Sequence, residues 1–381
     1  MRIRRDVLLG PALDEVTRDR RARALDLAEA ALAAIEPEAA TARALAGRAD
    51  LQGCTVLAFG KAAVPMARAA LRCCAPRGGL VVALAPADLG PLEVRLGEHP
   101  RPALDAPATG RAALELVRSL GADDVLLCLV SGGGSALLEL PAAGVTIEQI
   151  RATTEALLRG SVPIGALNAA RTRLSALKGG QLARATQARI VNLVLSDVPG
   201  QPASVVASGP TVADEARIRT TVVADNDTAV AGVLARAAER GIVLERAAGL
   251  VGEARDAGRR LVRDAAGAFA MDPRIDGFVA GGETTVTVTG DGDGGRNGEL
   301  VLGAADVLSS HLVLALATDG VDGGSRSAGA LLDPAALEGA RGSIAQALED
   351  NDSAPWLRRA GTLLETGPTG TNVADVALVL R

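Results

Sequence analysis

The chain is poor in aromatic residues and in histidine. It has no tyrosine, one tryptophan and three phenylalanines among 381 residues, which argues against binding nucleic acid by stacking bases on aromatic rings. The only histidines are His99 and His311, so a histidine-rich metal site is excluded and a Ser-His-Asp hydrolase has little support. His99 lies in Gly-Glu-His-Pro and could either contact a ligand or make a structural hydrogen bond.

Cysteines and long hydrophobic runs are also scarce. The four cysteines show no Cys-x-x-Cys spacing, so we expect reduced thiols rather than disulfides or a zinc site. No apolar run reaches the roughly 18–20 residues that a membrane helix needs. The net charge of −5 and the pI near 5.3 argue against a nucleic-acid partner. We therefore expect a soluble, cytoplasmic protein.

Lysine is nearly absent, since only Lys61 and Lys178 occur among the 40 basic residues. Lys61 follows Gly60 at a predicted strand-to-helix turn, where a compact ammonium group could bind a phosphate. Lys178 begins Lys-Gly-Gly at a predicted helix end, where a cation can offset exposed carbonyl groups. We therefore favour a functional role for Lys61 and a structural role for Lys178.

Apolar runs alternate with segments of helical period along the whole chain. Strands are predicted at 55–60, 79–85, 125–130, 190–195, 277–288 and 312–317. Helices are predicted at 61–72 and near 18–34, 106–120, 147–159, 166–177, 226–240, 254–269, 297–309 and 334–349. This alternation indicates α/β architecture with mostly parallel, Rossmann-like sheets. The length favours two domains, which we divide at about residue 240 into 1–240 and 241–381.

Glycine and hydroxyl side chains follow the predicted strand 125–130. The sequence Ser131-Gly132-Gly133-Gly134-Ser135 allows a ligand to approach the backbone closely, between two hydroxyl groups. A tight turn would explain one of these glycines but hardly three. We therefore predict an anion-binding loop here.

Aspartates follow two further strands. Asp197 comes directly after the strand 190–195 and could be a metal ligand, a general base or a turn former. Asp319 and Asp322 follow the strand 312–317 in a loop that contains glycine. Two such carboxylates suit Mg²⁺, which binds through one or two carboxylates together with substrate phosphates, although two successive Asp-Gly turns would look the same.

Residues 290–295 match the dinucleotide fingerprint Gly-x-Gly-x-x-Gly between a predicted strand and a predicted helix. Asp291 and Asp293 in this loop would repel a pyrophosphate, and Arg296 stands where the helix should begin. We therefore interpret Arg296 as the important residue here, a bidentate donor for phosphate or carboxylate.

The segment 366–375 collects threonine, glycine and asparagine in one loop, which suits either a ligand or a plain polar turn. The complete set of candidates is one lysine, one arginine, several aspartates and many glycines and hydroxyls. Such a set fits phosphoryl transfer, in which positioning and charge neutralisation carry most of the rate.

At these motifs the chain resembles the glycerate 2-kinases that carry a C-terminal MOFRL domain and were formerly often labelled hydroxypyruvate reductases. The similarity runs in order through nearly the whole chain and rests on the stretches 59–67, 97–102, 129–141, 168–183, 195–211, 281–300, 317–330 and 366–375. Each stretch alone is weak, but together they are highly specific.

The resemblance implies a kinase that uses ATP and Mg²⁺, or another divalent cation, to phosphorylate D-glycerate at its 2-hydroxyl. It also implies two α/β domains with the active site in a cleft between them. Carried over by motif, the catalytic residues would be Lys61, Asp197, Arg296 and Asp319, of which Asp197 and Asp319 could also hold the metal. The nucleotide would be bound by Ser131, Gly132, Gly133, Gly134, Ser135, Asn297, Thr369 and Asn372. No nucleic-acid or membrane partner is implied, and the oligomeric state stays open, with a homodimer among the options.

Two positions depart from the family pattern. Gly298 stands where a polar residue usually follows Gly-Arg-Asn, and Arg326 stands where an acidic residue is common. Two other functions also fit some features: a hydroxypyruvate reductase using NAD(P)H, which would use the loop 290–295, and a sensor that binds a sugar acid or nucleotide without turnover.

Overall fold

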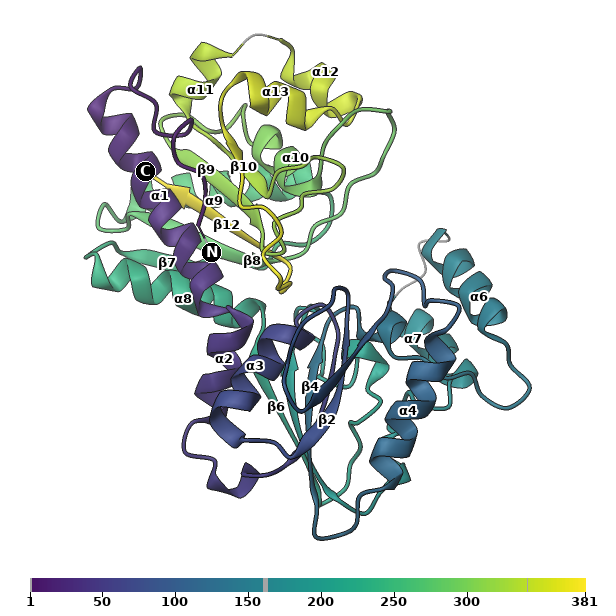
Figure 1. Cartoon of the computed structure of the whole chain (residues 1–381). Coiled ribbons are helices and arrows are strands. Elements are labelled where there is room, and N and C mark those ends of the chain that lie inside the picture. Colours follow the sequence, from purple (N-terminus) through teal and green to yellow (C-terminus); the bar gives the residue numbers. More distant parts are fainter. Residues whose placement is uncertain (1, 160–163, 341) are drawn as a thin grey trace. The chain divides into compact units, whose positions relative to one another are not determined.

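The computed structural model describes residues 2–159, 164–340 and 342–381, and the chain divides into two compact units (Figure 1). One unit consists of residues 37–225. The other combines residues 1–36 with residues 226–381. Each unit contains one six-stranded sheet, so the predicted architecture of two α/β domains is confirmed.

The sheet of residues 37–225 is entirely parallel. Its strands are paired in the order β3-β2-β1-β4-β5-β6. Three of them, β1, β4 and β5, are buried along almost their whole length, as expected for central strands covered on both faces. The strands are β1 Thr55–Phe59, β2 Gly78–Ala83, β3 Leu92–Leu96, β4 Val125–Ser131, β5 Arg189–Leu195 and β6 Ile218–Ala224.

The strand order of this sheet reverses between β1 and β4. From β1 the chain moves outward through β2 to β3, and it then returns to β4 on the other side of β1. The loops after β1 and β4 therefore leave the sheet in opposite directions, and such a switch point is where open parallel sheets bind ligands. The helices of the unit are α2 Pro37–Leu45, α3 Ala63–Cys74, α4 Ala106–Arg118, α5 Gly134–Leu137, α6 Ile147–Arg159 and α7 Ile164–Leu174.

The second sheet is mixed rather than mostly parallel, which corrects our expectation. Its order is β11-β10-β9-β12-β8-β7, and β12 is antiparallel to both neighbours, β8 and β9. The two neighbours run in the same direction, but the last strand lies between them and separates them. The strands are β7 Leu244–Arg246, β8 Gly277–Gly282, β9 Leu312–Ala317, β10 Gly329–Leu332, β11 Leu363–Leu364 and β12 Asp375–Leu380.

The N-terminal helix belongs to this second unit. Helix α1 packs against α8 and the strands β12 and β9, and Figure 1 shows it beside the C-terminal strand. The units thus differ from the predicted division at residue 240, because residues 1–36 and 226–240 pack on the second sheet. The helices are α1 Glu15–Ala34, α8 Asn226–Glu239, α9 Ala254–Met271, α10 Arg296–Gly303, α11 Pro334–Gly339, α12 Ile344–Glu349 and α13 Ser353–Arg359.

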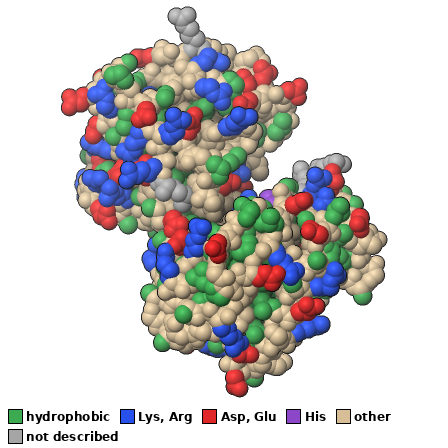
Figure 2. Space-filling view, in the orientation of Figure 1, with side chains coloured by type: hydrophobic (Ala, Val, Ile, Leu, Met, Phe, Trp, Pro, Cys, Tyr) green, Lys and Arg blue, Asp and Glu red, His purple; other side chains and the backbone are tan. Residues whose placement is uncertain are grey.

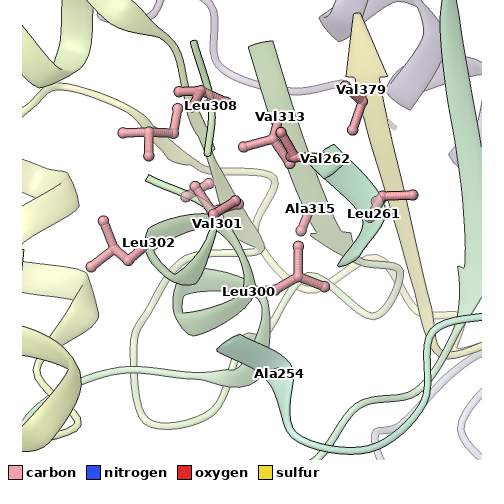
Figure 3. Close-up of a cluster of buried hydrophobic side chains, with 14 of the residues drawn as sticks. Ala254, Leu261, Val262, Leu300, Val301, Leu302, Leu308, Val313, Ala315 and Val379 are labelled. Atoms are coloured by element: carbon pink, nitrogen blue, oxygen red, sulfur yellow. The ribbon is translucent and has the colours of Figure 1, made fainter. Parts of the chain in front are cut away.

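The core on one face of the second sheet is mostly aliphatic, with Phe278 and Trp356 among its buried members. Figure 3 shows Val313 and Ala315 of β9 and Val379 of β12 facing residues of α9 and α10, among them Leu261 and Leu300. Alternate residues of these strands point to the opposite face, where α1 packs. This packing fixes the start of α10, and therefore Arg296, relative to the ends of β9 and β12.

One predicted strand ends earlier than expected, and one predicted helix is divided. The strand predicted at 277–288 ends at Gly282, and the helix predicted at 334–349 is two short helices, α11 and α12. In the described residues no helix is long and apolar enough to cross a membrane. On the face shown in Figure 2, basic side chains lie interspersed with acidic ones.

Candidate active site

Lys61 and the loop Ser131–Gly134 lie together at the switch point of the parallel sheet. The backbone N–H of Lys61 donates to the carbonyl oxygen of Gly132 at 2.9 Å, and the N–H of Ala62 donates to Oγ of Ser131 at 3.0 Å. A Cβ atom placed on Gly60 would lie 2.3 Å from the same Oγ. Gly60 therefore allows the two loops to approach each other closely.

Asp197 reaches the same loop from the end of β5. A Cβ atom placed on Gly132 would lie 2.0 Å from Oδ2 of Asp197, so the carboxylate lies directly against this glycine. A Cβ atom on the next glycine, Gly133, would lie 3.2 Å from Cγ of Lys61. The structure thus brings Lys61, Asp197 and the glycine loop together within one unit.

His99 is a member of this cluster that the sequence did not place in the site. Its Cδ2 would lie 3.1 Å from a Cβ on Gly133, on which the Lys61 side chain also converges. Burial lowers the pKa of His99 to about 4, and the positive charges of Lys61 and Arg171 act in the same direction. The imidazole is therefore neutral near pH 7, which leaves Lys61 as the charged group beside it.

The glycine loop also presents unpaired backbone donors. Gly133 has φ +81°, in the left-handed region that favours glycine. Among the residues that the structure describes, no acceptor takes the N–H groups of Gly133, Gly134 and Ser135, while Oγ of Ser135 lies 2.9 Å from Oγ of Ser208. This is the arrangement expected of a loop that binds an anion.

In the other unit, Arg296 begins helix α10 and is held by two carboxylates. Its Nε and Nη2 donate to the two oxygens of Asp375 at 2.5 and 3.0 Å, and its Nη1 lies 2.8 Å from Oε1 of Glu283. The Asp375 side chain is 2% exposed, whereas that of Glu283 is 48% exposed. One edge of the guanidinium is therefore fixed from inside, and the other faces a partner at the surface.

Asn297 joins this arrangement to the loop after β9. Its Nδ2 donates to Oδ1 of Asp322 at 3.2 Å and to Oδ1 of Asp375 at 3.1 Å. Asp322 also accepts the backbone N–H groups of Asn297 and Gly298 at 2.9 and 2.8 Å, so it caps the first turn of α10. Burial raises the pKa of Asp322, and burial raises that of Asp375 to about 6 although Arg296 opposes the change.

Asp319, Thr369 and Asn372 gather nearby in the same unit. The N–H of Thr369 donates to the carbonyl of Asp319 at 3.1 Å, and its Oγ1 donates to the carbonyl of Thr318 at 2.6 Å. Oδ1 of Asn372 accepts the N–H of Ala374 at 3.0 Å, and Oδ1 of Asp319 accepts that of Val321 at 3.0 Å. The loops 318–323 and 366–374 thus form one packed surface.

The glycine fingerprint at 290–295 is not a dinucleotide cradle. The N–H groups of Gly290 and Gly292 donate to Oδ1 of Asn351 and the carbonyl of Asp350, each at 2.9 Å. A Cβ on either glycine would lie 2.3–2.5 Å from that carbonyl. The glycines therefore allow close packing on the segment before α13. Since Asp322 already occupies the start of α10, these donors are not available to a pyrophosphate.

Asp197 and Asp319 are suited to a magnesium ion that is bound mainly by phosphates and water, with only one or two protein carboxylates. In the described ranges no three or more His, Cys, Asp or Glu side chains gather as a metal site. Mg²⁺ usually keeps several waters and takes one or two carboxylates together with phosphates. Asp197 in one unit and Asp319 in the other each follow a buried strand and are only partly buried, so each could supply one such carboxylate.

Lys178 is structural. Its Nζ pairs with a carboxylate oxygen of Glu139, and the side chains are 1% and 0% exposed. Burial lowers the pKa of Lys178, and the charge of Glu139 opposes the change. Of the two positions that depart from the family pattern, Arg326 is exposed, whereas a Cβ on Gly298 would lie 2.7 Å from Oγ of Ser353.

Comparisons with known proteins agree with this organisation. Two family models match the chain: a domain of unknown function, DUF4147, over residues 23–238, and the MOFRL family over residues 277–375. The chain is 34% identical to a D-glycerate 2-kinase of Thermotoga maritima, over 94% of this chain and 97% of that protein. A relative from Agrobacterium vitis, also 34% identical over 92% of both chains, carries the provisional name hydroxypyruvate reductase.

A solved structure extends the similarity to the fold. The crystal structure of glycerate kinase from Thermotoga maritima superposes with a TM-score of 0.86 and 32% identity, over 94% of this chain and 98% of that one. The similarity thus covers both units, including the loops that carry Lys61 and Arg296. The chain therefore belongs to the family of glycerate 2-kinases with a MOFRL domain.

Proposed function

We propose that this protein transfers the terminal phosphoryl group of ATP to the 2-hydroxyl of D-glycerate, giving 2-phosphoglycerate and ADP. The observation that carries the proposal is the meeting of Lys61 and Asp197 on the glycine loop 131–135. A cation, a carboxylate and a set of backbone donors at one switch point are what phosphoryl transfer requires, because its catalysis is mostly positioning and charge neutralisation. Family membership supplies glycerate as the substrate.

Lys61 and Arg296 neutralise the negative charge in this proposal. Lys61 would contact the transferring phosphoryl group, with the N–H groups of the glycine loop binding further phosphate oxygens. Arg296 would bind the phosphoryl group or the carboxylate of glycerate through the edge that now contacts Glu283. Its buried partner Asp375 keeps the guanidinium in place.

The two strand-end aspartates divide the remaining work. One of Asp197 and Asp319 orients or deprotonates the 2-hydroxyl, and the other holds the divalent cation. The position of Asp197 against Gly132 favours Asp197 for the hydroxyl and leaves Asp319 for the metal. A bound Mg²⁺ would neutralise charge on the nucleotide phosphates. Asn297, Thr369 and Asn372 would support these groups rather than react.

The reductase alternative loses its main support in this structure. It relied on the loop 290–295, whose donors are bound to residues 350–352. A sensor without turnover would need a cation to bind its anionic ligand, but not the carboxylate of Asp197 against the glycine loop. We therefore prefer the kinase to both.

A coupled assay tests the proposal. Purified protein is incubated with ATP, Mg²⁺ and D-glycerate, and enolase, pyruvate kinase and lactate dehydrogenase are added without phosphoglycerate mutase. Only 2-phosphoglycerate then leads to NADH oxidation, and a reaction without enolase gives the background.

One outcome of these assays would overturn the kinase proposal. The proposal is overturned if no NADH is oxidised with D-glycerate while the protein alone oxidises NADH in the presence of hydroxypyruvate. That second reaction must contain no lactate dehydrogenase, because this enzyme could itself reduce hydroxypyruvate.

A further inference from the structure

A cavity of about 700 Å³ lies beside Arg296 in the unit of residues 1–36 and 226–381. This volume falls in the range of about 300–1,000 Å³ that is usual for drug-sized ligands, and it is much larger than glycerate requires. Glycine backbone and aliphatic side chains form most of its wall. The lining residues that matter here are Thr284, Val286, Val288, Arg296, Gly323 and Gly324.

One wall of the cavity is anchored by the segment before α13. The N–H of Asp293 donates to Oδ1 of Asp352 at 3.0 Å, and the carbonyl of Asp293 accepts the N–H of Ala354 at 3.0 Å. On the other side, the N–H of Gly324 donates to the carbonyl of Gly294 at 3.0 Å. The wall is therefore held from two directions, which favours a cavity that exists before a ligand binds.

A second wall is the segment Thr284–Val288, whose backbone is hydrogen-bonded along one side only. Thr285 donates its N–H to Gly252 and accepts the N–H of Ala254, both at 2.8 Å. Successive peptide groups of an extended chain point in opposite directions, so Thr284, Val286 and Val288 direct theirs to the other edge. In the part of the chain that the structure describes, the N–H and C=O groups of these three residues have no hydrogen-bond partner.

The charged end of the cavity is Arg296. Asp375 holds its Nε and Nη2 from inside, and Nη1 contacts the half-exposed Glu283. An exposed ion pair of this kind contributes little, so an anion with several oxygens can replace Glu283. The cavity therefore combines the apolar surface of Val286 and Val288, a row of free backbone donors and acceptors, and the Arg296 cation at its end.

We propose that this cavity holds the nucleoside part of the nucleotide co-substrate, with the base along the free edge of Thr284–Val288 and the phosphates toward Arg296. A purine base presents a flat face and a row of donors and acceptors, which match a wall of glycine backbone and the unpaired backbone groups of Thr284, Val286 and Val288. The inference rests on the proposed function in one respect, namely that a nucleotide is the phosphoryl donor.

Gly324 gives a direct test. A Cβ on this residue would have no neighbour closer than 3.7 Å, and its backbone does not require glycine. Gly324→Leu should therefore occupy part of the cavity and leave the fold intact. The matched control is Gly267→Leu on helix α9, where a Cβ meets nothing within 4 Å and which is not among the residues that line this cavity.

Binding of ADP with Mg²⁺ to the full chain is measured by isothermal titration calorimetry. Gly324→Leu should weaken this binding about tenfold and raise the KM for ATP similarly, with Gly324→Ala intermediate, because the side chain takes up space that the nucleoside would occupy. The KM for D-glycerate and the melting temperature should not change. Gly267→Leu should bind ADP as the unmodified protein does.

The failures of the two proposals differ. If the unmodified protein binds ADP and both Gly324 variants bind it equally well, the nucleoside does not occupy this cavity, but the kinase assignment stands. If the unmodified protein neither binds ADP nor phosphorylates D-glycerate, the proposed function is wrong and the assignment of the cavity falls with it.

Discussion

Arg296 and Asp375 are joined at two points, Nε to Oδ2 at 2.5 Å and Nη2 to Oδ1 at 3.0 Å. Arg296 is the first residue of α10, and Asp375 is the first residue of the central strand β12. The contact therefore fixes the guanidinium by the rigid parts of the unit rather than by a loop. Asp375 was not among the site residues predicted from the sequence.

We predict that Asp375→Asn lowers kcat through Arg296. Loss of the charged partner frees the guanidinium, and a misplacement of about 1 Å can cost about 100-fold in rate. Arg296→Ala removes the group itself and should cost about 1,000-fold or more. Steady-state kinetics of the single and double variants test the relation: the double variant should be no slower than Arg296→Ala. Independent, multiplying losses would contradict a positioning role.

The acidic limb of the pH profile should depend on Asp375. Its pKa of about 6 means that the carboxyl group gains a proton below this pH and holds Arg296 less strongly. The charged groups that face it are Arg296 and Asp322, with Glu283 acting through Arg296. We expect kcat to fall below about pH 6, and the fall to be weaker in Asp375→Asn. The comparison is made at each pH between the two proteins, because the nucleotide phosphate also titrates.

The raised pKa of Asp375 affects stability in the opposite sense: the free energy of unfolding should fall as pH rises. Between about pH 4 and pH 6 the unfolded chain has already lost the proton that folded Asp375 retains, so the folded state binds more protons and loses stability as pH rises. A shift from 3.8 to about 6 corresponds to about 3 kcal/mol in the free energy of unfolding. Asp375→Asn should flatten this part of the stability profile, measured by urea unfolding. An unchanged profile would rule out Asp375 as its source.

Gly132→Ala should impair catalysis without unfolding the protein. The new methyl group would meet Oδ2 of Asp197 at 2.0 Å, so the carboxylate must move. We expect kcat to fall about 100-fold. Gly121→Ala in the same unit is the control, because its nearest neighbour would lie at 3.9 Å. Equal kcat values for the two variants would show that the position of Asp197 does not matter.

Breaking the buried pair of Lys178 and Glu139 should destabilise the protein. Lys178→Met leaves a buried carboxylate unpaired, which costs about 3–5 kcal/mol, whereas replacing both residues by Met and Leu should restore much of the loss. Melting temperatures of the single and double variants measure this. If Lys178 were instead a catalytic group, the double variant would be stable but inactive.

The strands that could be predicted from the sequence are those whose own residues show that they are buried. The apolar runs of β1, β4 and β5 are continuous because both faces of a central parallel strand are buried, and a continuous run is visible without knowledge of the neighbours. Strand β12 is equally apolar, yet it was missed because the residues before it resembled a ligand loop. Its antiparallel position follows from pairing with strands far away in the sequence.

The same division between local signals and distant contacts holds for the site residues. Lys61 and Asp197 were predicted because they directly follow buried strands, where open parallel sheets bind ligands, and because lysine is so rare in this chain. Asp375 and His99 were missed because their roles depend on contacts with Arg296 and Gly133, which lie far away in the sequence. The dinucleotide fingerprint, which Asp291 and Asp293 already disfavoured, has a structural origin: its first two glycines pack on Asp350 and Asp352, and its third packs on Asp322.

The central position of β12 determines when the second sheet can be completed during synthesis and folding. During synthesis β8 and β9 emerge well before the strand that must separate them, so they cannot pair with each other and still reach the final sheet. Until residues 375–380 arrive, both strands carry an unpaired inner edge, and such edges are sites of aggregation. Arg296 gains its buried partner in the same event, so the sheet and its arginine are completed together.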